Sequence, residues 1–460
     1  MAFSTLEFIF IFLPIFFLVY LFADIKYKNL IMLIASLIFY FIGAKSNPLY
    51  IPLTLISVYL NYRLGILIGE KRDKKKYLVL GLLLNFGYLF IFKYFDFFSG
   101  AIASINGSKP LLLHLALPLG ISFYTFQVVS YLIDVYRNKI PPEKNIIKFS
   151  AYIMMFIKFI SGPITSYNEV KPYLDKKKNN IYSIELGIKY FVIGLGYKVL
   201  IANRIGGVWA EASALGYDSI STPLAWLAAI SYSLQLYFDF HGYTMMAKGI
   251  GKILGMDLPD NFDHPYISKS MTEFWRRWHM TLGRWFKNYI YIPLGGSKNG
   301  TFKLILSTFA VWLFTGLWHG ADWNFVIWGL GLFAIIMIEK FFIKEHLDKH
   351  PWLGHTYMLI LIPVSWTVFA VSDLSKLGQL LNRMFIYKNS GFFAGDYVKI
   401  VTNYWYLYLA GILFSTTLPK KIAEKNKIKF IENIVIIGIF WLSIYCLCTQ
   451  ANDPFMYFQF

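Results

Sequence analysis

Apolar runs alternate with short polar loops along almost the whole chain. The first run ends at Phe22 and is followed at once by Asp24, Lys26 and Lys28. Many of the runs approach the roughly 20 apolar residues that an α-helix needs to cross the hydrocarbon core of a bilayer. The pattern predicts an all-α, multi-pass membrane protein with about eleven transmembrane segments.

The candidate runs for these segments are the two that end near Phe22 and Ile68 and those at residues 29–43, 77–92, 111–136, 184–202, 223–240, 302–318, 323–342, 355–371, 401–418 and 430–447. One further apolar stretch, residues 149–170, lies between two basic runs, "YRNKIPPEKNIIK" and "KPYLDKKKNN". Basic loops mark the cytoplasmic side. This stretch is therefore expected to enter and leave on that side or to lie along the interface, with a bend at Gly162 and Pro163.

Composition and charge exclude a soluble enzyme. The 460 residues are 57% hydrophobic and 15% charged, whereas a soluble domain is typically about 25% charged. Lysine and arginine number 44 against 26 for aspartate and glutamate. The basic residues lie in short loops between apolar runs, which indicates membrane topology and argues against a nucleic-acid partner. The block "GEKRDKKK" is predicted to be cytoplasmic, which places the N-terminus and residues 99–110 outside.

Cysteine and acidic residues do not suggest a metal site. Cys446 and Cys448 are the only cysteines, and both lie in the last apolar run, so neither a disulfide framework nor a zinc site is predicted. Three acids near His264 have a spacing that matches no compact metal site. No metal is assigned.

Residues 241–301 are predicted to form an amphipathic or re-entrant region on the cytoplasmic side. Ser270 and Glu273 match a capping box, so a helix is expected to begin near Met271. Tryptophan, phenylalanine and leucine then recur at helical spacing, at positions 274, 275, 278, 282, 285 and 286, with basic residues among them. A basic, tryptophan-rich helix of this kind is typical of an interfacial anchor.

A binding surface is the alternative interpretation of the same region. Arg276 and Arg277 could bind phosphate groups, because a guanidinium donates hydrogen bonds in pairs. Trp278 could stack on an adenine ring, and His279 is expected to face inward. The pattern leaves the anchor and the binding surface both open.

Residues 302–342 are predicted to form a helix pair that carries a buried histidine. His319 follows an apolar run that starts near Phe302, so at about 1.5 Å per residue it lies roughly 20 Å or more from the cytoplasmic surface. Gly316 and Gly320 bracket it and permit close helix packing or a break in the helix. An ionisable side chain at this depth indicates a functional site. The alternative is a neutral histidine that is satisfied by a hydrogen bond between helices.

These motifs resemble the membrane-bound O-acyltransferase family, and within it the bacterial branch that O-acetylates exported polysaccharides such as alginate or peptidoglycan. The resemblance rests on "EFWRRWHMTLGRWFKNYIYIPLGG", "LWHG", "YFDFHGYTMMAKGIG", "PLGISFYTFQ" and "DPFMYFQF", which together extend over most of the chain. His241 and Met245 depart from the "YFDFSGYSDMAIG" pattern of this branch, and "FIKFISGP" replaces an "FPQ"-like entry. Both departures concern the donor or the acceptor and leave acyl transfer as the expected reaction.

The resemblance implies a single membrane domain over residues 1–460. This domain would be a ring of about eleven transmembrane helices, with re-entrant and interfacial helices, around a thin central plug and a tunnel. His319 would be the catalytic histidine and His279 the second motif histidine. The chain is expected in the bacterial inner (plasma) membrane. It would take acetyl from acetyl-CoA or another cytoplasmic thioester, hold no bound cofactor, and act on an exported polysaccharide through an extracytoplasmic partner protein.

The expected chemistry is general base catalysis by His319 on an acceptor hydroxyl, and an acyl-histidine intermediate stays open. Trp318, Asn288 and Asn324 are candidate donors to the oxyanion, and each is equally well explained as a structural hydrogen bond. Asp239 is assigned to the site as well. It could fix a histidine tautomer or form an intramembrane ion pair with Arg276 or Lys252.

Two other functions compete with acetyl transfer. One is D-alanyl transfer to teichoic acid from a carrier protein, which the same resemblance allows. The other is a transporter for a polysaccharide or an acyl carrier, although internal repeats with paired broken helices are not evident. Tyr457 near the C-terminus is interpreted as an interfacial aromatic anchor or as a transient acyl acceptor.

Overall fold

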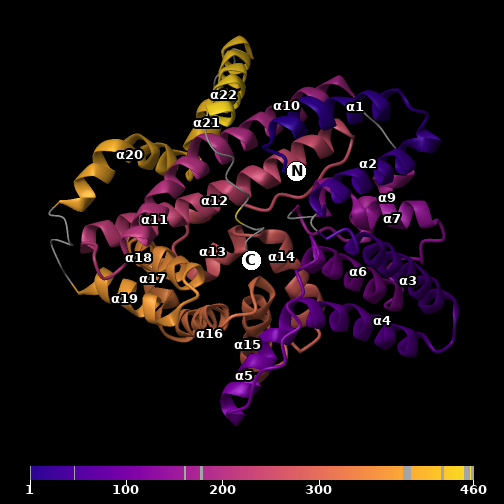
Figure 1. Ribbon diagram of the computed structural model, residues 1–460, viewed down its shortest axis with the longest axis horizontal. Helices are drawn as coiled ribbons and strands as arrows, with labels where there is room; N and C mark the ends of the chain where they lie inside the picture. Colours follow the sequence, from indigo (N-terminus) through magenta and orange to yellow (C-terminus); the bar gives the residue numbers. More distant parts are fainter. Residues whose placement is uncertain are drawn as a thin grey trace. The chain divides into compact units, whose positions relative to one another are not determined.

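The computed structural model describes residues 2–45, 47–159, 162–176, 180–386, 395–425 and 429–449, and Met456. Within these residues every regular element is a helix, as predicted (Figure 1). The chain divides into two compact units, Met1–Phe191 with Met246–Pro259 and Val192–Met245 with Asp260–Phe460. The expectation of one membrane domain over the whole chain stays a prediction.

Seven helical stretches of the described residues are long and apolar enough to cross a membrane: Ile25–Gly43, Tyr50–Glu70, Lys74–Asn106, Thr301–His319, Trp323–Lys349, Pro351–Ala370 and Lys429–Thr449. A shorter apolar helix covers Phe8–Phe22. The chain is thus a multi-pass membrane protein. The span expected at 111–136 is too long, because a helix forms only over Ile121–Tyr136. It starts after Gly120, which has a left-handed φ of 74° that stops a helix from extending backwards.

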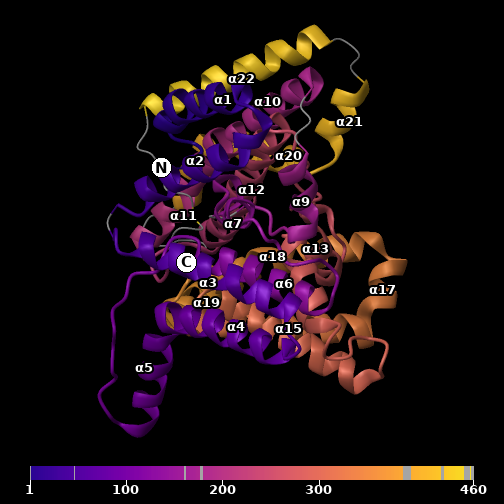
Figure 2. The same cartoon turned by 90° about the vertical axis from the view of Figure 1, so that its right-hand side faces the viewer.

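The first unit contains α1 (Leu13–Phe22), α2 (Lys28–Gly43), α3 (Tyr50–Glu70), α4 (Lys74–Leu89), α5 (Phe95–Asn106), α6 (Ile121–Tyr136), α7 (Ile146–Met154), α8 (Phe156–Phe159), α9 (Tyr167–Asp175) and most of α10 (Ile181–Gly196). Helices α3, α4 and α6 lie side by side (Figure 2). Gly81 permits this packing, because a Cβ atom there would lie 2.7 Å from a methyl carbon of Leu132. Asn61 and Asn85 join α3 to α4 by reciprocal amide hydrogen bonds of 3.1 and 2.6 Å.

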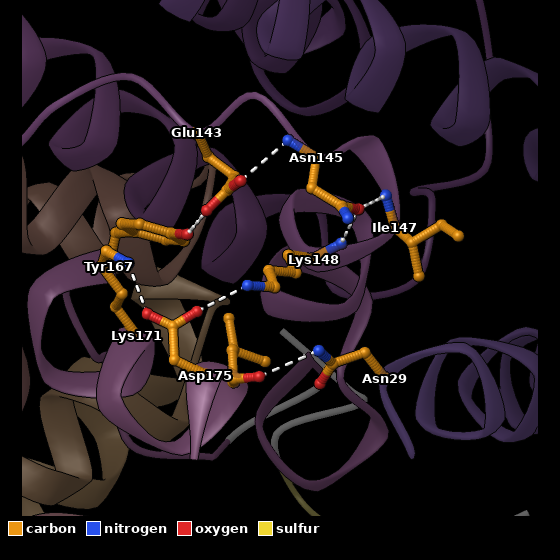
Figure 3. A network of polar contacts seen from close by, with 9 residues as sticks. Asn29, Glu143, Asn145, Ile147, Lys148, Tyr167, Lys171 and Asp175 are labelled. Atoms are coloured by element: carbon orange, nitrogen blue, oxygen red, sulfur yellow. Dashed lines mark hydrogen bonds and ion pairs between the residues drawn. The ribbon is translucent and has the colours of Figure 1, made fainter. Parts of the chain in front are cut away.

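The apolar stretch 149–170 does not form one continuous helix. It contains the end of α7, the short α8 and the start of α9, which agrees with the predicted break. A polar network braces this segment (Figure 3). Asp175 at the end of α9 accepts from Lys148 of α7 at 2.6 Å and from Lys171 at 2.5 Å, and Tyr167 donates to Glu143. The ends of the broken segment are therefore tied to each other.

The second unit contains the end of α10, α11 (Asn203–Leu215), most of α12 (Thr222–Ile253), α13 (Met271–Arg277), α14 (Met280–Phe286), α15 (Thr301–His319), α16 (Trp323–Ile338), α17 (Lys344–Lys349), α18 (Pro351–Ala370), α19 (Leu374–Phe385), α20 (Asp396–Phe414), α21 (Leu418–Lys425) and α22 (Lys429–Thr449). Helices α15 and α16 pack along each other (Figure 1). A Cβ atom on Gly329 of α16 would lie 2.5 Å from the backbone oxygen of Trp312. Small residues thus let the two backbones meet, as is common between membrane helices.

Short turns that are wider (π-helical) or tighter (3₁₀) than an α-helix interrupt or extend these helices. The π-helical turns are Phe8–Phe12, Phe90–Tyr94, Tyr197–Ala202, Lys287–Tyr291 and Glu339–Ile343, and the 3₁₀ turns are Ile25–Tyr27 and Pro265–Ile267. Such irregular turns often occur at functional sites. The turn Lys287–Tyr291 carries Asn288, one of the predicted site residues.

The amphipathic helix predicted from Met271 is two helices. Its start is confirmed, because the Ser270 hydroxyl accepts from the backbone N–H of Glu273 at 3.1 Å. The prediction of a single helix is wrong, because α13 ends at Arg277 and α14 begins at Met280. Two backbone hydrogen bonds to a neighbouring loop hold the break: Asp263 N–H to Arg277 O and Met280 N–H to Asn261 O, each 3.0 Å.

Candidate functional site

His319 is the last residue of α15 and is buried, with 4% of its surface exposed. The helix stops there because Gly320 is fully extended, with φ −161° and ψ 158°. The imidazole is surrounded by aromatic rings, with ring-centre distances of 4.8 Å to Trp318, 5.2 Å to Trp328 and 5.1 Å to Phe369. Residues of α15, α16 and α18 therefore form its surroundings.

Close packing of α15, α16 and α18 fixes this position. Gly316, three residues before His319, leaves no room for a side chain, because a Cβ atom there would lie 2.4 Å from the backbone oxygen of Phe325. Asn324 ties α16 to the end of α18: its amide nitrogen donates to Phe369 O at 2.8 Å and to Val368 O at 3.4 Å. Of the two alternatives for Asn324, a structural hydrogen bond is the one observed.

His279 lies in the break between α13 and α14 and is more deeply buried, with 1% of its surface exposed. Its backbone is left-handed, with φ 43° and ψ 52°. The ring contacts Phe240 of α12 at 4.8 Å and Trp318 of α15 at 5.9 Å between ring centres. Since Trp318 also contacts His319, the indole joins the two histidines. The structure thus brings together His279, Trp318 and His319 of the predicted site.

Asn261 is a residue of this site that the sequence analysis missed. Its side-chain oxygen lies 3.1 Å from Nδ1 of His279 and 2.8 Å from the hydroxyl of Thr281. Asn261 is 18 positions before His279, in a loop without helical or strand periodicity. The pattern around it gives no sign of the contact. Burial lowers the pKa of His279 to about 3, so this imidazole is neutral at physiological pH.

The predicted donor-binding residues Trp278, Arg276 and Arg277 lie in different surroundings. Trp278 is buried in an aromatic cluster and stacks on Phe274 with 5.4 Å between ring centres. Arg277 forms ion pairs with Glu273 at 2.9 Å and with Asp263 at 3.2 Å. Arg276 is exposed. A role for these three side chains in donor binding stays a prediction.

Asp239 of α12 forms an ion pair inside the second unit. Its carboxylate lies 2.5 Å from Nζ of Lys198, and the two side chains are 1% and 3% exposed. The prediction that Arg276 or Lys252 pairs with Asp239 is wrong. Lys252 pairs instead with Asp257 at 2.9 Å. The other carboxylate oxygen accepts the backbone N–H of Met456 at 3.0 Å. The local sequence could not identify a partner 41 positions away.

The remaining predicted residues are Asn288 and Tyr457. Asn288 is half-buried on its π-helical turn. Tyr457 lies outside the described residues. In the part of the chain that the structure describes, no three His, Cys, Asp or Glu side chains gather closely enough to hold a metal ion.

Comparison with known proteins gives this site a family context. Residues 141–362, which include both histidines, match the model of the membrane-bound O-acyltransferase (MBOAT) family. The probable alginate O-acetylase AlgI of Pseudomonas putida is 33% identical over 490 residues, covering 100% of both chains. The peptidoglycan O-acetyltransferase of Helicobacter pylori is 36% identical over 84% of this chain and 80% of its own. The teichoic acid D-alanyltransferase of Streptococcus thermophilus is 31% identical over 49% of this chain and 57% of its own. On this similarity and its motifs, the chain belongs to the membrane-bound O-acyltransferase family.

Proposed function

We propose that this O-acyltransferase moves an acetyl group from a cytoplasmic thioester, acetyl-CoA, toward an exported polysaccharide on the other side of the membrane. The observation that carries the proposal is the pair of buried histidines joined by Trp318. The similarity to alginate and peptidoglycan O-acetylating proteins over most of the chain supports a glycan as final acceptor.

His319 is the proposed general base. Its imidazole takes the proton of an acceptor hydroxyl while the oxygen attacks the thioester carbonyl carbon. A C–O bond forms, the tetrahedral intermediate collapses, and the C–S bond breaks. The thiolate leaves with the proton that the imidazolium returns. The aromatic rings around His319 exclude water, and exclusion of water limits hydrolysis of the thioester.

The indole of Trp318 is the candidate donor to the oxyanion. Trp318 is buried and its ring contacts the rings of both histidines, so the indole is a side chain with an N–H donor that lies beside both. Asn324 is a weaker candidate, because its amide nitrogen already donates to two backbone oxygens. A preorganised donor of this kind is worth roughly 10²–10³ in rate.

In this proposal the histidines lie on a path through the membrane. A ring of helices around a thin central plug would form a tunnel, so that the acetyl group crosses while the bulk of its donor stays in the cytoplasm. A separate extracytoplasmic protein would receive the group and modify the polysaccharide. The protein would lie in the inner membrane of a bacterium, with its N-terminus on the outer side of that membrane.

The test uses the purified protein in lipid with radiolabelled acetyl-CoA, a cell-envelope acceptor fraction and candidate partner proteins. We expect His319→Ala to lower label transfer by about 10²–10⁴-fold. His355→Ala is the matched control, because His355 is an exposed histidine on α18 and its loss should leave transfer unchanged. Full activity of a folded His319→Ala protein would refute the assignment.

D-alanyl transfer is the second candidate. Half of this chain aligns with a teichoic acid D-alanyltransferase, and the two reactions differ in donor, not in the expected role of His319. Transfer from a D-alanyl carrier protein, with no transfer from acetyl-CoA, would favour this candidate. No transfer from either donor would favour a transport function.

A further inference from the structure

Asn261 lies at the centre of a small hydrogen-bonded group around His279. It is 2% exposed, and its side-chain oxygen is within hydrogen-bonding distance of three atoms. These are Nδ1 of His279 at 3.1 Å, the Thr281 hydroxyl at 2.8 Å and the Thr281 backbone nitrogen at 3.3 Å. The backbone oxygen of Asn261 also accepts from Met280 N–H at 3.0 Å. Both ends of the residue therefore hold the chain around His279.

These contacts determine the tautomer of His279. A backbone N–H can only donate, so the Asn261 atom that faces Thr281 N–H must be the amide oxygen and not the nitrogen. Nδ1 of His279 faces the same oxygen and must also donate. A neutral imidazole carries one N–H. The proton is therefore on Nδ1, and Nε2 carries a lone pair.

Nε2 of His279 is buried and has no hydrogen-bond partner among the described residues. A buried nitrogen lone pair without a partner is costly, because it gives up hydrogen bonds to water. The backbone of His279 adds strain, since its left-handed φ of 43° costs a residue other than glycine roughly 1–2 kcal/mol. Such costs at one residue indicate a functional constraint.

We infer that Asn261 is a positioning residue that holds His279 in its Nδ1–H form and presents the Nε2 lone pair to an O–H, N–H or S–H group of a substrate. This inference rests on the proposed function, which places His279 in the acyl-transfer site. It excludes direct binding of a phosphate or carboxylate oxygen by His279, because a neutral lone pair repels anionic oxygen. The substrate group at His279 is a hydrogen-bond donor, such as the acceptor hydroxyl, a thiol or an amide.

The first test measures the tautomer directly and does not depend on activity. Protein labelled with ¹⁵N-histidine is studied in lipid by solid-state NMR, and the signals of His279 are identified by their loss in His279→Gln. We expect a protonated Nδ1 and an unprotonated Nε2 between about pH 5 and 8, since burial keeps this imidazole neutral. A proton on Nε2 would overturn the inference.

The second test uses Asn261→Leu, which removes the acceptor oxygen at similar volume. We expect acetyl transfer to fall about 10²-fold, the usual worth of a correctly positioned acid–base group. A folded Asn261→Leu protein with transfer within about threefold of wild type would overturn the inference.

Asn261→Asp gives a readout that a purely structural role would not move. A carboxylate next to Nδ1 stabilises the imidazolium and raises the pKa of His279. We expect the acid limb of the kcat/KM profile to move to higher pH, and an unmoved limb would overturn the inference even where Asn261→Leu fails to fold. Asn85→Asp is the matched control. Asn85 is buried and bonds Asn61 and Gly81 O, so its exchange should lower stability without moving the limb.

The proposed function and the inference about Asn261 can be refuted independently. Absence of transfer by the wild-type protein from any donor would refute the proposed function, and the NMR measurement would still decide the tautomer. Normal transfer by wild type with a proton on Nε2 of His279 would refute the inference alone.

Discussion

Lys158 in the first unit is a buried cation-forming residue for which the proposed chemistry has no use. It lies on α8, outside the spanning helices, and is 0% exposed. Its Nζ donates to Gln127 at 2.6 Å and to Thr165 at 3.3 Å, and it lies 3.8 Å from the centre of the Tyr152 ring. Among the described residues no carboxylate forms an ion pair with it. Burial therefore holds the pKa of Lys158 well below its usual value.

The low pKa of Lys158 predicts a pH dependence of stability. In the unfolded chain Lys158 keeps a pKa near 10.4, so the unfolded state binds the extra proton below that pH. Stability due to Lys158 is then full above about pH 10.4 and is lost as the pH falls toward the folded-state pKa. We expect the apparent Tm of the wild-type protein to rise between about pH 7 and 10. Lys158→Met should flatten this rise.

The measurement is the apparent Tm in detergent across this pH range. Wild type and Lys158→Met are compared by the slope of Tm against pH. Their absolute Tm values are not compared, because losing the hydrogen bonds to Gln127 and Thr165 also changes stability by an amount that does not vary with pH. Lys109→Met is the control, since Lys109 is exposed and its removal should leave the slope as it is. Parallel curves of Tm against pH for wild type and Lys158→Met would show that the Lys158 amine is charged in the folded protein.

At the level of residues, burial could be predicted where a residue type is conspicuous in its context. A histidine in an apolar run is rare, so the burial of His319 was predicted and is confirmed, whereas the catalytic roles of His319 and Trp318 stay predictions. Asn261 and Lys198 were missed. Each acts through a partner 18 or 41 positions away, and only the folded chain brings these partners within hydrogen-bonding distance.

At the level of elements, the contact between α15 and α16 positions the candidate site. It holds His319 at the end of α15 against Trp328 of α16. The backbones meet at Gly316 and Gly329, where a Cβ atom on Gly329 would lie 3.2 Å from Gly316 Cα as well as 2.5 Å from Trp312 O. Backbone atoms cannot move aside as a flexible side chain can. A methyl group here must therefore push the helices apart.

Gly329→Ala is accordingly expected to destabilise the protein by about 1–3 kcal/mol, the usual cost of overpacking. It should also lower acetyl transfer about tenfold or more, because a displacement of about 1 Å at a reacting group is costly. Thermal unfolding and transfer are measured on the same preparation.

Gly331→Ala is the matched control on the same helix. A Cβ atom on Gly331 meets no atom of the described residues within 4 Å, so this exchange should be neutral or stabilising by up to about 1 kcal/mol. Equal behaviour of Gly329→Ala and Gly331→Ala would show that close approach at Gly329 is not required.

The limits of sequence-based prediction at this scale are clear at α13 and α14. The hydrophobic spacing continues through Trp278 and Leu282 as if the helix were unbroken, and the cap at Ser270 was predicted. The break comes from hydrogen bonds to the loop at Asn261 and Asp263. Periodicity reports which side of a segment is apolar, and it carries no information about a distant loop that competes for the backbone. In the same way, the predicted span at 111–136 counted apolar residues that precede the left-handed Gly120.

At the level of the whole molecule, the proposed direction of acetyl transfer depends on which loops face the cytoplasm. Helix α3 ends at Glu70 and α4 begins at Lys74, so the basic block "GEKRDKKK" lies at a tight turn between two candidate spans. The next loop begins at Gly107 after α5 and carries a single lysine, Lys109, before α6. This asymmetry predicts that the first loop is cytoplasmic and the second is outside.

Single cysteines at Arg72 and Ser108 test this orientation. The native Cys446 and Cys448 are first replaced by serine, and transfer by this background protein is verified. Cells with an accessible outer face of the membrane are treated with a membrane-impermeant maleimide. We expect labelling of Ser108→Cys and not of Arg72→Cys, and labelling of both once detergent opens the membrane. The reverse pattern would place the basic block outside. His319 would then be approached from the opposite face, and the proposed passage of acetyl from cytoplasm to exterior would have to be abandoned even if its chemistry were correct.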